Sequence, residues 1–84
     1  MTKIPRNLDS NDFIKLLKYL NYNFVHQRGS HIKFSKTIND SKFSISLPNH
    51  KPLKVGTLSA IINQICIQNN MQKDEIIRIV IDLN

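Results

Sequence analysis

The residues of this chain best suited to chemistry are Arg28-Gly29-Ser30-His31, which lie between two short runs of strand-forming residues, 23–27 and 32–36. Glycine at the first central position favours a two-residue type II′ turn, which places Arg28 opposite His31. Directly opposed residues keep their Cβ atoms about 4.5–5.5 Å apart, so a guanidinium group can hold a phosphate beside an imidazole ring. Because imidazole titrates near pH ~6.5, it can both accept and donate a proton. In a small basic chain this combination indicates an RNA partner.

The positive charge is unevenly distributed along the chain. The formal net charge is +6, because residues 1–56 hold ten Lys and Arg against three Asp, whereas residues 57–84 hold two basic residues against three acidic ones. A basic N-terminal two thirds favours a polyanionic partner, with an acidic membrane surface as the competing interpretation. No apolar stretch approaches the ~20 residues that a membrane span requires, and the N-terminus lacks the apolar block of a signal peptide. We therefore expect a cytoplasmic protein that does not bind membranes.

The length of 84 residues predicts one domain, 1–84, with a single modest core and no large cofactor cavity. The single cysteine, Cys66, permits no internal disulfide, fits a reducing compartment and is expected to be a small buried hydrophobe. One Glu and five Asp are scattered along the chain and form no carboxylate cluster, zinc pattern or Ser-His-Asp set. We expect no metal and no cofactor.

Hydrophobic periodicity predicts an α+β fold in the order α-β-β-β-α, followed by a further helix. The first helix begins near Asp9 or Ser10, either of which can act as N-cap, and ends near Asn21, because Asn tolerates a left-handed backbone. Its apolar positions are Phe13, Leu16, Leu17 and Leu20. Residues 42–47 alternate as a third strand that buries Phe43, Ile45 and Leu47 and stops at Pro48.

Residues 37–41 have the polar chemistry of a hairpin loop, so the three strands form an antiparallel meander. The second helix covers about 55–68, with Leu58, Ile61, Ile62 and Ile65 facing a core shared with the first helix. The third helix covers about 73–83. In this helix Ile79 and Ile81 widen the apolar stripe, so it either binds a partner or simply caps the core.

The register of the first hairpin leaves one question about its aromatic residues. A regular two-residue turn would place Tyr22, Phe24 and His26 on the same face as His31. Either the aromatic rings then lie on an open face and stack on bases, or a β-bulge returns them to the core. We favour the core, because aromatic residues in a domain with few of them are more often used for packing.

The chain resembles the HicA-type toxins, small ribonucleases with a double-stranded-RNA-binding-domain-like fold that cleave messenger RNA. The strongest part of the resemblance is QRGSH at residues 27–31, which is similar to the family's Gly-Ser-His signature. LPNH at 47–50 and LKVGTL at 53–58 follow in the family's order and spacing. The chain departs from the pattern at Ser59-Ala60, where relatives often have basic residues, and at Cys66, where they often have glycine.

The resemblance implies that His31 is the catalytic residue and that a HicB-type antitoxin binds and blocks the protein. RNA carries a 2′-hydroxyl beside each scissile phosphate, so a histidine can promote in-line attack without a metal ion. His31 would serve as that base or as the acid for the leaving 5′-oxygen, and Arg28 or Lys33 would stabilise the developing charge. His26 and His50 are candidates for a second proton-transfer group, and an enzyme with a single histidine and modest turnover is the alternative.

Further RNA contacts are expected from Ser30, Lys51 and Lys54, the two lysines lying just ahead of a helix N-terminus. Gly29 and Gly56 are expected to be structural turn residues. Arg28 and Lys33 also have an ordinary interpretation as a solvated edge that discourages sheet aggregation, and loop lysines such as Lys51 and Lys54 usually just face solvent. Two other functions therefore stay open: a non-catalytic double-stranded-RNA-binding module and an interaction protein with an acidic partner.

Overall fold

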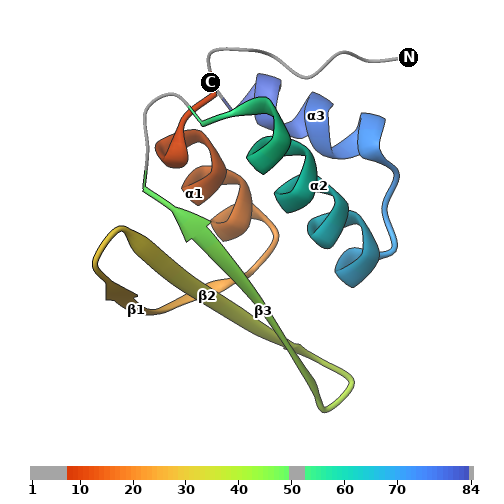
Figure 1. The fold of residues 1–84 in the computed structure, drawn as a ribbon. Helices are drawn as coiled ribbons and strands as arrows, with labels where there is room; N and C mark the ends of the chain where they lie inside the picture. Colours follow the sequence, from red (N-terminus) through yellow and green to blue (C-terminus); the bar gives the residue numbers. More distant parts are fainter. Residues whose placement is uncertain (1–7, 50–52, 84) are drawn as a thin grey trace.

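The computed structural model describes residues 8–49 and 53–83, which form one antiparallel sheet with helices on one of its faces (Figure 1). The elements are α1 (Ser10–Tyr19), β1 (Asn23–Arg28), β2 (His31–Ile38), β3 (Ser41–Pro48), α2 (Val55–Asn69) and α3 (Lys73–Asp82). The predicted α+β, double-stranded-RNA-binding-domain-like order and the additional C-terminal helix are both confirmed.

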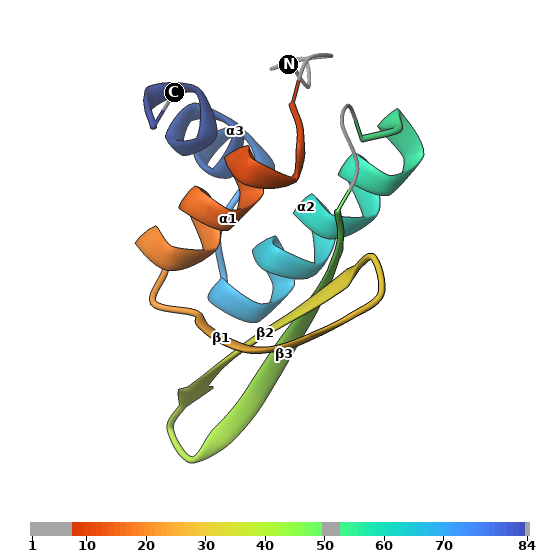
Figure 2. The ribbon, with the colours of Figure 1, turned by 90° about the vertical axis from the view of Figure 1, so that its left-hand side faces the viewer.

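The sheet has the order β1-β2-β3, so β1 and β3 are its edges. Helices α1 and α2 lie over one face of the sheet, and α3 contacts both of these helices (Figure 2). The opposite face carries none of the described helices. This one-sided packing explains why alternate residues of β2 and β3 are buried while their neighbours are not.

Helix α1 begins where the sequence predicts, and it ends at Tyr19, two residues before the predicted terminating residue Asn21. Asp9 is the N-cap, because its side chain accepts a hydrogen bond from the Asp12 N–H at 3.2 Å and Asp12 accepts one from the Asp9 N–H at 2.9 Å. At the other end, Asn21 adopts a φ of 70°, and the Tyr22 N–H donates to the Leu17 carbonyl at 2.8 Å. These two features form a Schellman motif, which turns the chain directly into β1.

The connection between β2 and β3 is shorter than the predicted loop of residues 37–41. Asn39 and Asp40 alone form the turn, with φ values of 50° and 68°. Positive φ at both central residues is the signature of a type I′ turn, whose twist matches that of the flanking strands. The strands can therefore extend to Ile38 and from Ser41. On β3, Ile45 and Leu47 are fully buried as predicted, whereas Phe43 is only half-buried.

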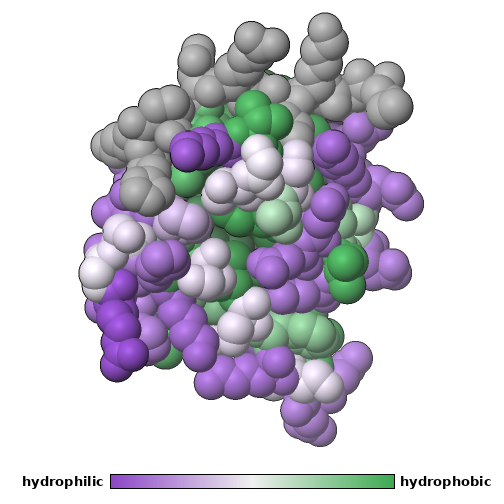
Figure 3. Space-filling view, viewed as in Figure 1, coloured by the Kyte–Doolittle hydropathy of each residue, from purple (hydrophilic) through white to green (hydrophobic). Residues whose placement is uncertain are grey.

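The core lies between the sheet and the helices and includes the predicted apolar face of α2. Helix α3 buries Ile76, Ile77 and Val80, so it caps the core. Ile79 packs partly against that core, and Ile81 is 50% exposed. Cys66 is partly buried, and this burial raises the pKa of its thiol. The space-filling view shows hydrophobic residues as separate patches on a mainly hydrophilic surface (Figure 3).

Among the residues that the structure describes, no helix has the length and apolar character needed to cross a membrane.

Candidate functional site

The hairpin that carries His31 has the geometry predicted from its sequence. Gly29 has a φ of 59°, whereas Ser30 does not have a positive φ, which is the sign pattern of a type II′ turn. Arg28 is paired with His31, the first residue of β2. The Gln27 side-chain amide donates a hydrogen bond to the Gly29 carbonyl at 3.1 Å and closes the turn.

A β-bulge at Val25 answers the question about the aromatic residues. Phe24 pairs with Phe34 and His26 pairs with Lys33, so Val25 has no partner on β2. The extra residue turns Phe24 to the helix side of the sheet, where its ring meets Phe34 edge to face at 6.1 Å. Tyr22 is buried as expected, but Phe24 remains 59% exposed, in a groove beside α1. Neither ring lies beside His31.

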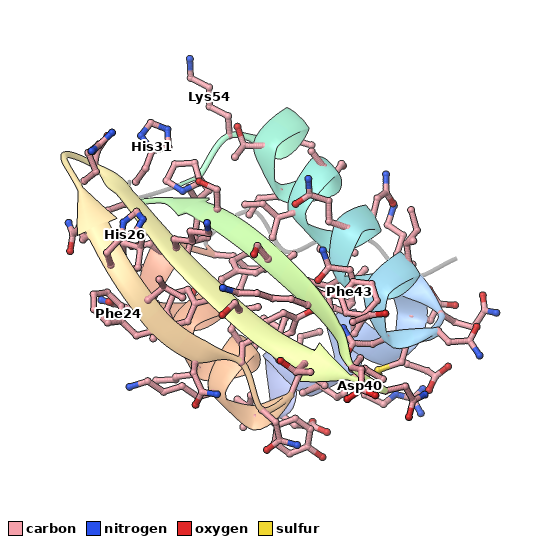
Figure 4. All side chains as sticks on the ribbon, turned by 90° about the horizontal axis from the view of Figure 1, so that it is seen from below. Phe24, His26, His31, Asp40, Phe43 and Lys54 are labelled. Carbon is pink, nitrogen blue, oxygen red and sulfur yellow. The ribbon has the colours of Figure 1, made fainter. Side chains whose placement is uncertain are left out.

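The bulge leaves a group of four side chains on the side of the sheet away from the helices, which we name the basic face: His26, Arg28, His31 and Lys33. His26, Arg28 and His31 are exposed, and Lys33 is half-buried. The two histidines project from neighbouring strands at one end of the sheet (Figure 4). The three strands contain no Asp or Glu, so the strands place no negative charge beside these groups.

The basic face is continued on β3 by small or uncharged residues. Ser46 is paired with Lys33 and Pro48 with His31. Neither side chain carries charge or great bulk, so both leave the imidazole ring of His31 open to solvent. Among the described residues, no group of three or more His, Cys, Asp or Glu side chains could hold a metal ion.

Asn49 fixes the position of the turn before His31, a role that the sequence reasoning missed. Its backbone N–H donates to the Ser30 carbonyl at 2.6 Å, and its side-chain oxygen accepts a hydrogen bond from Ser10 Oγ at 2.7 Å. Ser10 is fully buried at the start of α1. The hydrogen bonds therefore join the turn, the end of β3 and α1. The LPNH motif at 47–50 contained this residue, but its spacing alone gave no partner.

The remaining predicted site residues lie in different surroundings. Lys54 is exposed at the N-cap position of α2, and Figure 4 shows it beyond the end of the sheet that carries His31. Gly56 lies in the first turn of α2 rather than in a tight turn, and a Cβ there would meet no atom within 4 Å. Ser30 is exposed in the hairpin turn. His50 and Lys51 lie outside the described residues.

The structure is a small α+β domain with a one-sided three-stranded sheet and an exposed histidine directly after a Gly-Ser turn. Residues 10–67, which are more than half of the chain, match a family described as the HicA toxin of bacterial toxin-antitoxin. The chain therefore belongs to the HicA toxin family, and membership of a toxin-antitoxin family implies an antitoxin as partner. Comparisons with curated proteins and with solved structures gave no match.

Proposed function

We propose that this toxin is an endoribonuclease that cleaves messenger RNA in the cytoplasm, with His31 as a general acid or base. The observation that carries the proposal is the exposure of His31 on an open sheet face, with Arg28 opposite it and Lys33 two residues along the same strand face. An imidazole ring enclosed by the core could not reach a ribose. This ring is open to solvent and has cations as neighbours.

The chemistry requires little more than these groups. RNA supplies its own nucleophile, the 2′-hydroxyl beside the scissile phosphate, and a histidine can remove its proton or protonate the leaving 5′-oxygen. The guanidinium of Arg28 and the ammonium of Lys33 would stabilise the negative charge that develops on the phosphate. Their positions on either side of His31 allow one phosphate group to contact all three side chains.

The rest of the RNA would lie along the same end of the molecule. Lys54 is exposed there, at the start of a helix whose free N–H groups favour anions. We assign Ser30, Lys51 and Lys54 to backbone contacts, which position the strand without reading its sequence. A HicB-type antitoxin is the partner that we propose, and occlusion of the basic face would be sufficient for its inhibition.

The decisive experiment compares His31→Ala with the native protein in RNA cleavage, RNA binding and growth arrest. We expect cleavage and growth arrest to be lost, with the melting temperature and most of the RNA affinity retained. Thr37→Ala is the matched control, because Thr37 is exposed on the same face of β2 but far from the turn. Cleavage at the native rate by His31→Ala would leave the non-catalytic double-stranded-RNA-binding module as the better interpretation.

Affinity for RNA distinguishes an interaction protein for an acidic partner from the ribonuclease and from the non-catalytic RNA-binding module. Both RNA-binding functions predict an affinity that falls as salt rises, because bound phosphates release counterions. An interaction protein for an acidic partner would show no measurable RNA affinity at low salt.

A further inference from the structure

Transesterification of RNA involves two proton transfers, of which His31 can supply only one at a time. The O2′–P bond forms and the P–O5′ bond breaks. One proton leaves the 2′-hydroxyl for a base, and another passes from an acid to the leaving O5′. The products are a 2′,3′-cyclic phosphate and a 5′-hydroxyl, and no other reactant is consumed. Enzymes that perform both transfers with side chains need two titratable groups, one on each side of the phosphate.

We propose that His26 is the second proton-transfer residue of this site, an inference that rests on the proposed ribonuclease function. The register places His26 opposite Lys33 and His31 opposite Arg28, so the two imidazoles occupy one diagonal of a four-residue square and the two cations occupy the other. The Cα atoms of diagonal neighbours in an antiparallel pair of strands are about 7–8 Å apart. That separation accommodates one phosphate group between two rings, with a cation on either flank.

The bulge at Val25 makes this arrangement accessible. In an unbulged hairpin, Phe24 would lie next to His26 on the same face and would cover it. In this protein Phe24 is turned toward Phe34 on the helix side instead. His26 is therefore the first residue of β1 after the bulge, and its side chain is exposed on the basic face. Figure 4 shows it projecting near His31.

No structural role accounts for His26. Among the described residues, its ring makes no hydrogen bond, ion pair or ring contact, and it does not belong to the core. The groups that face it are Arg28 on its own strand and His31 and Lys33 on β2, while β3 contributes the uncharged Ser46 and Pro48. A proton-transfer residue must be accessible to its substrate, and the neighbouring cations can hold the phosphate of that substrate.

The test measures single-turnover cleavage of an RNA oligonucleotide by the full chain carrying His26→Gln or His26→Arg. We expect His26→Gln to reduce the maximal rate about 10²- to 10⁴-fold, the range typical of a lost general acid or base, with little change in KM. His26→Arg should keep RNA affinity without restoring the rate. A histidine that acts only as a phosphate-binding cation would give the opposite result: higher KM, an unchanged maximal rate and rescue by arginine.

Two further readouts identify which transfer His26 performs. The native pH–rate profile should be bell-shaped, and His26→Gln should remove one of its two limbs. On RNA with sulfur in place of the leaving 5′-oxygen, the leaving group needs no proton. If His26 is the acid, His26→Gln should regain nearly native rates on that substrate; if it is the base, His31→Gln should regain them instead.

Thr37→Ala is again the control, since it changes an exposed residue on the same face, far from the turn, without removing a titratable group. If His31→Gln is inactive while His26→Gln cleaves at the native rate with a two-limbed pH–rate profile, the role of His26 is disproved and the proposed ribonuclease function stands. Absence of cleavage by the native protein would overturn both the proposed function and the role of His26. Equal melting temperatures for the variants show that the fold is intact.

Discussion

The ammonium group of Lys36 lies over the ring of Tyr22, with its Nζ atom 4.7 Å from the ring centroid. Lys36 Nζ also donates to the Leu20 carbonyl at 2.9 Å and to the side chain of Asn69, so it joins the C-terminal ends of α1 and α2 to β2. Burial lowers the pKa of this lysine. Of the two lysines on β2, Lys33 therefore belongs to the basic face, whereas Lys36 forms structural hydrogen bonds on the helix side of the sheet.

Replacing Lys36 with Met should destabilise the protein without affecting RNA cleavage. The substitution keeps an apolar stem but removes hydrogen bonds from a charged donor, for which a loss of about 1–3 kcal/mol is typical. Urea unfolding measures the difference. Lys42→Met, at an exposed position on β3, is the control and should lie within about 0.5 kcal/mol of the native protein. Equal stability of the two variants would contradict a structural role for Lys36.

Tyr22 should make the fold sensitive to alkaline pH. Its hydroxyl donates to Gln68 at 2.6 Å and accepts from Asn69 at 3.0 Å, and burial raises the pKa of the phenol above its ordinary value of 10.0. Because the folded pKa exceeds the unfolded one, this contribution to stability is complete below pH 10.0 and is lost as pH rises through the folded pKa. Phenolate absorbance should reveal a late-titrating tyrosine that is missing in Tyr22→Phe. An unchanged titration curve in that variant would disprove the assignment.

Alanine substitution at Gly29 and at Gly56 should change the stability of the protein in opposite directions. A Cβ would meet no atom within 4 Å at either position, but Gly29 alone has a positive φ, of 59°. Gly29→Ala should therefore cost about 1–2 kcal/mol in backbone strain, whereas Gly56→Ala should gain up to about 1 kcal/mol in helix propensity. Thermal unfolding distinguishes the two. Gly29→Asn should cost less than Gly29→Ala, since Asn tolerates a left-handed backbone.

The hydrogen bond between Ser10 and Asn49 should show energetic coupling. Asn49→Ala leaves the buried Ser10 hydroxyl without its acceptor, which costs about 1–3 kcal/mol. Once Ser10→Ala has been introduced, the same change at Asn49 should cost less, and a double-mutant cycle from urea unfolding measures the difference. Strictly additive effects would mean that this bond does not hold the turn to α1.

The basic face should determine the salt dependence of RNA binding. Lys33→Gln should lower affinity and should reduce the slope of log affinity against log salt by about 0.7, the value for one phosphate contact on a single strand. Lys42→Gln removes the same charge from an exposed position at the other end of the sheet and should leave that slope unchanged. Equal slopes for the two variants would show that the RNA does not bind to the basic face.

The sequence by itself determined the elements and the hairpin at the site. Asp9 and Asn21 set the ends of α1 through hydrogen bonds to residues only a few positions away, and Gly29 set the turn that pairs Arg28 with His31. Such signals are local: each depends on neighbours along the chain and on the φ values that a residue type can adopt.

Tertiary structure decided which face each side chain occupies beyond the turn. Burial of Tyr22 depends on Gln68 and Asn69, which lie 46 and 47 residues further along the chain, and that burial accompanies the bulge at Val25. Asn49 and Lys36 likewise found their partners on distant elements. Since moving the register by one residue exchanges the two faces of a strand, only the packing of helices against the sheet could separate Phe24 from the two histidines.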